Sequence, residues 1–198
     1  MSTRDDLLAR VRRLQPPAEP LPDLPPFARG QSQLPGSFEA FAQALARMGG
    51  RVELPPAQAD ATAAVRALFP QARVICSATP EVAGDRDLAS VREPAELDDV
   101  DVGVVRAVFA VAETGSVLLT EAQLKVPALG FLSQHLVVLL DPSAIVATLH
   151  DAYVHPAFAK ARYTILMTGP SATADIEGVL IRGAQGVRSL TVLPLAAR

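Results

Sequence analysis

The chain has 198 residues, a formal net charge of -3 and 20% charged residues, which is typical of one globular domain. With a pI of about 5.6, no Trp and two Tyr, it lacks the basic surface and the aromatic platform of a nucleic-acid-binding protein. The one cysteine, Cys76, excludes an internal disulfide. It supplies one of the about four thiolates that an iron–sulfur cluster needs, so we expect no cluster bound by this chain alone.

Residues 1–36 are predicted to form a short helix and a proline-rich linker. Leu7, Leu8, Val11 and Leu14 lie at helical spacing, and residues 16–35 contain seven of the 17 prolines. The N-terminal stretch has no continuous apolar core of the kind that secretory signals carry. No apolar stretch approaches the about 20 residues that span a bilayer. The sequence therefore predicts a cytoplasmic protein without a membrane span.

Residues 37–198 are predicted to form a single α/β domain with a largely parallel sheet. We expect helices over residues 37–48, 56–69, 143–153 and 174–183. We expect strands over 51–54, 73–77, 117–120, 135–140, 163–167 and 189–193, and in at least the second half of the apolar run 102–112. Residues 85–99 are acidic and irregular. Continuous apolar runs such as VVLL are typical of strands covered on both faces.

The segment 163–186 contains the most informative candidate site. An expected strand leads into Gly169-Pro170-Ser171 and then into the expected helix. Free amides at that helix start, with the hydroxyls of Ser171 and Thr173, would bind a small carboxylate or phosphate. Ordinary helix capping is the alternative, with Asp175 and Glu177 near the positive helix end. The segment matches neither the dinucleotide fingerprint nor the P-loop.

A second candidate is Glu113, which directly follows an apolar strand and precedes the turn 114–116. A carboxylate at this place can act as a nucleophile, a general base or a ligand contact. A solvated turn residue is the alternative. In a shared site, Glu113 would lie at the carboxyl end of a central strand and face a cleft that also contains the loop 169–173.

The remaining reactive residue types give no further site. His135, His150 and His155 show no compact metal-ligand spacing, so no metal site is expected. Cys76 lies in an apolar strand, where a buried and inert thiol is the usual state.

Two motifs resemble the LUD-domain family, and within it the lactate-utilisation protein C branch. They are E-T-G-S at 113–116 and G-P-S-A-T-A-D-I-E at 169–177. The resemblance extends over about residues 100–198 and includes Gly183 and Gly186. It implies a Rossmann-like fold, with a mostly parallel sheet and helices on both faces, similar to the sugar-phosphate isomerase and CoA-transferase superfamily.

The resemblance also implies a role in oxidising L-lactate to pyruvate together with iron–sulfur partner proteins. Two alternatives stay open: a stand-alone CoA-transferase-like or isomerase-like enzyme that uses Glu113, and a scaffold or regulatory module without chemistry. The candidate catalytic residue is Glu113. The candidate ligand-binding residues come from both motifs and are Thr114, Gly115, Gly169, Pro170, Ser171, Thr173, Asp175 and Glu177.

Overall fold

The structure is a computed structural model, and it describes residues 3–17, 19–20, 37–55, 60–175 and 178–195. The chain divides into two compact units, Met1–Gln31 and Ser32–Arg198. The first unit contains α1 (Thr3–Leu14), with Asp5 and Asp6 in its first turn and arginines in its last turn, as the helix dipole favours. Most of the expected linker lies outside the described residues.

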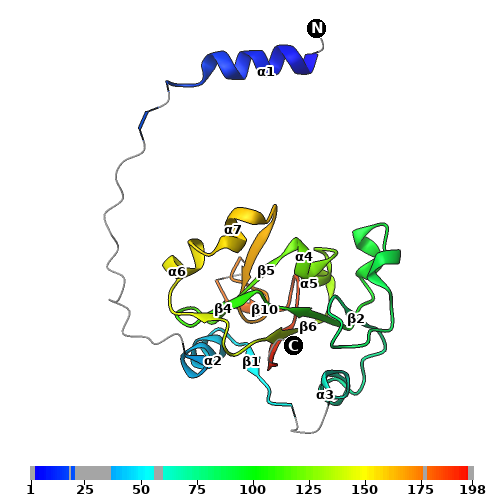
Figure 1. Cartoon of the computed structure of the whole chain (residues 1–198). Coiled ribbons are helices and arrows are strands. Elements are labelled where there is room, and N and C mark those ends of the chain that lie inside the picture. Colours follow the sequence, from blue (N-terminus) through cyan, green and yellow to red (C-terminus); the bar gives the residue numbers. More distant parts are fainter. Residues whose placement is uncertain (1–2, 18, 21–36, 56–59, 176–177, 196–198) are drawn as a thin grey trace. The chain divides into compact units, whose positions relative to one another are not determined.

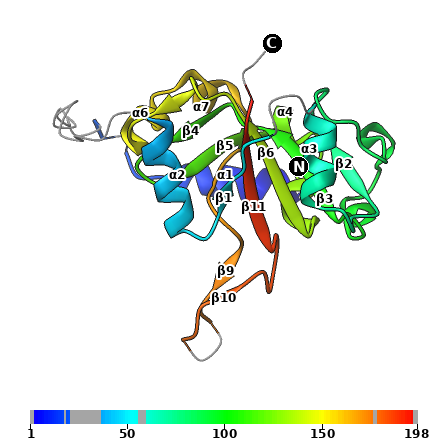
Figure 2. The same ribbon diagram turned by 90° about the horizontal axis from the view of Figure 1, so that it is seen from below.

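The second unit is built on a five-stranded sheet with the order β1-β11-β6-β3-β2. The strands are β1 (Arg51–Val52), β2 (Ile75–Ser77), β3 (Val102–Arg106), β6 (His135–Leu140) and β11 (Ser189–Pro194). Every pairing is parallel, so all carboxyl ends lie at one edge (Figure 2). The predicted α/β class with a mostly parallel sheet is confirmed.

Helices cover both faces of this sheet. Alternate residues of β6 separate the two cores: Leu136 and Val138 belong to one, and Val137 and Leu139 to the other. α2 (Phe38–Arg47), α4 (Glu121–Leu124) and α5 (Leu129–Leu132) pack into the first core, and α3 (Ala61–Leu68) packs into the second. As the sequence predicts, the hydroxyl of Ser37 caps α2 by accepting from Ala40 N at 3.1 Å.

A second sheet of four strands lies next to the first in the fold, with the order β7-β4-β5-β8 (Figure 1). Its strands are β4 (Phe109–Val111), β5 (Ser116–Thr120), β7 (Ile145–Val146) and β8 (Thr164–Met167). The apolar run 102–112 therefore contributes one strand to each sheet, β3 to the first and β4 to the second. Ala107 N still bonds to Leu139 O of the first sheet, whereas Val108 N bonds to Leu118 O of the second.

Two expected helices differ in the structure. The helix expected over 143–153 is shortened to α6 (Leu149–Tyr153), because Ile145 and Val146 pair with β4 instead. β-branched residues favour such a strand. A further short helix, α7 (Pro156–Lys160), follows it.

The prediction of a helix over residues 174–183 is wrong. Ala172–Thr173 (β9) and Ile181–Arg182 (β10) instead form an antiparallel hairpin, which projects from the sheets (Figure 2). Two glycines in this segment, Gly178 and Gly183, have φ near +70°, a backbone region that a helix does not use. Val179 and Leu180 are about 60% exposed, so no core is available to bury a helix face. Glu177 lies outside the described residues.

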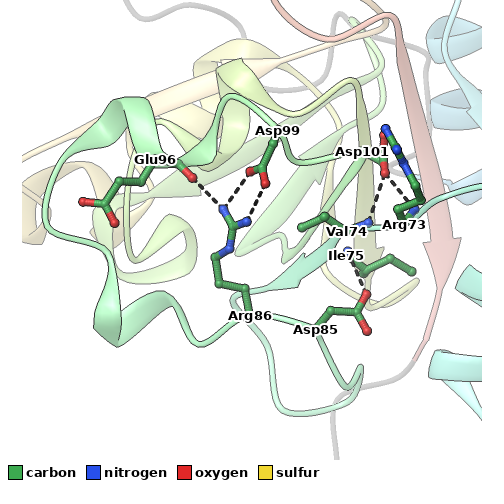
Figure 3. Close-up of polar contacts among 8 residues, drawn as sticks. All are labelled: Arg73, Val74, Ile75, Asp85, Arg86, Glu96, Asp99 and Asp101. Carbon is green, nitrogen blue, oxygen red and sulfur yellow. Dashed lines mark hydrogen bonds and ion pairs between the residues drawn. The ribbon is translucent and has the colours of Figure 1, made fainter.

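The acidic segment after β2 forms two short 3-10 helices, η1 (Leu88–Ser90) and η2 (Pro94–Leu97). Asp85 of this segment, and Asp101 just before β3, accept hydrogen bonds from the backbone at the start of β2, as Figure 3 shows. Asp85 accepts from Ile75 N at 2.9 Å, and Asp101 accepts from Arg73 N and Val74 N at 2.7 and 3.0 Å. Arg86 forms a bidentate ion pair with Asp99.

Candidate functional site

The two sequence motifs lie next to each other at one edge of the second sheet. β4 and β8 are both antiparallel to β5, so the residues after them, Glu113 and Gly169, lie at the same edge of the second sheet. The hydroxyl of Thr168 donates to Gly115 O at 2.9 Å and lies 3.3 Å from Thr114 O. The E-T-G-S turn and the G-P-S loop are therefore neighbours, although the sheet that joins them is the second one and not the central sheet.

Two motif glycines allow α2 to pack closely against this edge. A Cβ atom on Gly115 would lie 2.2 Å from Leu45 N, and one on Gly169 would lie 2.3 Å from Met48 O. Both residues also have positive φ, at 68° and 62°. The sequence motifs predict ligand binding at these two glycines and do not reveal this packing role. A side chain at either position would push α2 away from the core.

Glu113 is exposed, and its carboxylate points to α6. Its Oε2 accepts from Leu149 N at 2.9 Å, and its own N–H donates to Ala147 O at 3.0 Å. A carboxylate beside the first N–H groups of a helix is electrostatically favourable. Among the described residues, Oε1 of Glu113 accepts no hydrogen bond, so one oxygen stays open to solvent.

The G-P-S loop lines a cavity of about 450 Å³, which we call the loop cavity. α5 contributes Phe131 and Leu132, the end of β8 contributes Met167, and the segment before β11 contributes Gln185 and Gly186. Glu113 is not part of its lining, and the described lining carries no charged side chain. Because a hairpin replaces the expected helix, the G-P-S loop leads into no helix N-terminus whose free amides could bind an anion.

The other residues of the second motif bond mainly within the hairpin. Ser171 N donates to Val187 O at 2.9 Å, and Gly183 N donates to Ser171 O at 2.7 Å. The hydroxyl of Thr173 donates to the carboxylate of Asp175 at 2.9 Å. These contacts hold the base of the hairpin next to the loop cavity. Pro170 is buried in the cavity wall.

A family model, the LUD domain, matches residues 92–193, which include both motifs. The chain belongs to the LUD-domain family. The crystal structure of a DUF162-family protein from Deinococcus radiodurans has the same fold as this LUD domain, with a TM-score of 0.61 and 22% sequence identity. The similarity covers 79% of this chain and 94% of that protein. No functionally curated protein matches the chain at a significant level.

The cysteine and the histidines of this LUD domain lie apart from the loop cavity. Cys76 is buried in β2, and burial raises the pKa of its thiol. Nδ1 of His135 lies 2.8 Å from Ser189 Oγ. Burial, followed by the nearby Arg188 and Arg51, lowers the pKa of His135.

Within the described ranges, no three His, Cys, Asp or Glu side chains are grouped to hold a metal ion. None of the helices described here is long and apolar enough to cross a bilayer.

Proposed function

We propose that this LUD domain is the subunit without clusters in a system that oxidises L-lactate to pyruvate, together with iron–sulfur partner proteins. The match of the LUD family model over residues 92–193 carries this proposal, since the family is related to lactate utilisation. The cysteine count agrees with it: the chain has one thiol, whereas a cluster takes about four thiolates. In this proposal the partners carry the electrons.

The region where the two motifs meet is proposed as the active site of the subunit. Glu113 is its candidate catalytic carboxylate, because it is exposed and keeps one oxygen free of hydrogen bonds among the described residues. The loop cavity beside Gly169 and Ser171 is of a size that small ligands occupy in proteins. The same open carboxylate supports a second candidate function, an acyl-CoA transferase in which Glu113 is the nucleophile.

Gene deletion and affinity capture test the first function together. Deleting the gene from its host should abolish growth on L-lactate but not on pyruvate, and the wild-type gene should restore it. The tagged chain should capture cysteine-rich iron–sulfur proteins from lactate-grown cells. Normal growth of the deletion strain on L-lactate would refute the proposal.

The transferase is tested by mass spectrometry of the purified chain after incubation with acyl-CoA. A thioester on Glu113 that is missing from Glu113→Gln would establish it. Glu121→Gln is the matched control, because the Glu121 carboxylate likewise accepts hydrogen bonds from backbone N–H groups, namely those of Arg162 and Tyr163. An unmodified Glu113 across a panel of acyl-CoAs would rule the transferase out.

A further inference from the structure

The wall of the loop cavity is apolar and, among the described lining residues, carries no charge. Phe131, Leu132, Met167 and Pro170 all contribute to this wall. Phe131 and Leu132 are 36% and 38% exposed, which leaves apolar surface for a ligand to cover. A carboxylate or phosphate in this cavity would lose hydration without meeting a cation of the described lining. The loop cavity therefore favours an uncharged ligand with an apolar body.

The backbone carbonyl of Phe131, which borders the cavity, lacks its usual hydrogen-bond donors. It lies in the last turn of α5, where carbonyls need partners from outside the helix. The amides three and four residues later are engaged elsewhere. Gln134 N donates to Val100 O at 3.0 Å, and His135 N donates to Asp101 O at 2.9 Å. No other group in the described part of the chain donates to Phe131 O, so this carbonyl is open to a ligand.

The hydroxyl of Ser171 is a second open polar group, and it lies near that carbonyl. Its Oγ forms no hydrogen bond with any residue that the structure describes. A Cβ atom on Gly186 would lie 3.3 Å from Ser171 Oγ and 3.7 Å from Phe131 O, so both oxygens border the space that this glycine leaves open. All three residues line the loop cavity. The cavity thus presents a hydroxyl donor and a carbonyl acceptor near one point.

We propose that the loop cavity binds an uncharged aromatic carboxamide. A carboxamide carries an acceptor and a donor on one carbon without a charge. Its oxygen accepts a hydrogen bond from the Ser171 hydroxyl, and its N–H donates to Phe131 O. The ring covers Leu132 and Met167, whose sulfur makes favourable contacts with aromatic rings. This assignment names the ligand class of the loop cavity, and it rests on the proposed function only in treating that cavity as part of the active site.

The methionines give a direct readout with an internal control. The chain contains three, of which Met167 lines the cavity, whereas Met48 is 51% exposed and lies outside the lining. The full chain is labelled with ¹³C at the methionine methyl groups, and Met167→Leu assigns the Met167 signal. An aromatic ring bound beside this methyl group changes its chemical shift. We expect a saturable shift of Met167 during titration with benzamide and no comparable shift of Met48.

Two molecules of the same shape as benzamide test the chemistry of the site. Acetophenone replaces the amide nitrogen by a methyl group and leaves Phe131 O without a donor, so it should bind about three- to tenfold more weakly. Benzoate carries a charge that the described lining does not neutralise, so it should bind at least about tenfold more weakly. Equal binding of benzamide and either analogue would overturn the proposal. No shift of Met167 up to the solubility limit of benzamide would overturn it as well.

Two variants separate the hydrogen bond from the exclusion of charge. Ser171→Ala should weaken benzamide by about three- to tenfold, whereas Ser90→Ala, at an exposed serine of η1 outside the lining, should bind as the wild type does. Leu132→Lys should strengthen benzoate, because it adds a cation to the wall. Circular dichroism confirms that each variant is folded. Wild-type affinity for benzamide in Ser171→Ala, or for benzoate in Leu132→Lys, would refute the assignment.

These titrations use the purified chain without lactate or partner proteins. Failure of the benzamide titration would therefore leave the gene-deletion experiment as it stands. Normal growth of the deletion strain on L-lactate would likewise refute the proposed function without changing the measured preference for the carboxamide.

Discussion

Gly115→Ala is expected to destabilise the chain far more than an ordinary glycine-to-alanine change. The new Cβ atom would lie 2.2 Å from Leu45 N and 2.5 Å from Leu45 Cα, whereas ordinary contacts begin near 3.4 Å. The α2 backbone would therefore have to retreat by about 1 Å. α2 buries Phe41 and Leu45 completely, so this retreat would loosen the core on that face of the sheet.

The magnitude follows from two contributions. An L-residue in the left-handed region costs about 1–2 kcal/mol, and overpacking of a filled core costs about 1–3 kcal/mol. The free energy of unfolding should therefore fall by about 2–5 kcal/mol. That is a large share of the about 5–15 kcal/mol that stabilises a typical domain.

Gly178→Ala provides the matched control. Gly178 also has positive φ, at 70°, but a Cβ atom there meets no atom within 4 Å. This variant should therefore lose only the backbone contribution of about 1–2 kcal/mol. Urea unfolding followed by far-UV circular dichroism measures both variants. If they lose stability equally, within about 0.5 kcal/mol, the close packing of α2 against Gly115 is refuted.

Three further predictions address charge and strain. A gene with Glu113→Gln should fail to restore growth of the deletion strain on L-lactate. The urea midpoint of this variant should stay near that of the wild type, since exposed isosteric changes cost within about ±0.5 kcal/mol. A normal growth rate would contradict a catalytic Glu113. Hydrogen bonds lower the pKa of Asp85, Asp99 and Asp101, so these carboxylates stabilise the fold above about pH 4. Unfolding measured against pH should show this stability lost as the pH falls through their lowered pKa values, and Asp101→Asn should flatten that dependence. Lys125 has φ 61° and ψ −60° in a classic γ-turn, which Val126 N closes by donating to Leu124 O at 2.7 Å. Lys125→Gly should therefore raise the free energy of unfolding by about 1 kcal/mol, because glycine accepts positive φ. A loss of stability in thermal unfolding would show that this turn is not strained.

The sequence by itself determined the fold class and the family of this protein. Apolar runs such as residues 135–140 pair in parallel and are buried on both faces, because such a run leaves no face for water. Ser37 predicted the start of α2 correctly, since capping is a local interaction. The motifs at 113–116 and 169–177 predicted the LUD family, which the family model confirms.

Only the tertiary structure decided what these motifs contact. The local pattern over 174–183 favours a helix, but that stretch finds no core to pack against and forms a hairpin. The steric reason for Gly115 lies at Leu45, which is 70 residues away in the chain, and no local spacing reveals such a contact. Burial and long-range packing, which depend on the whole chain, decide such features where local propensity does not.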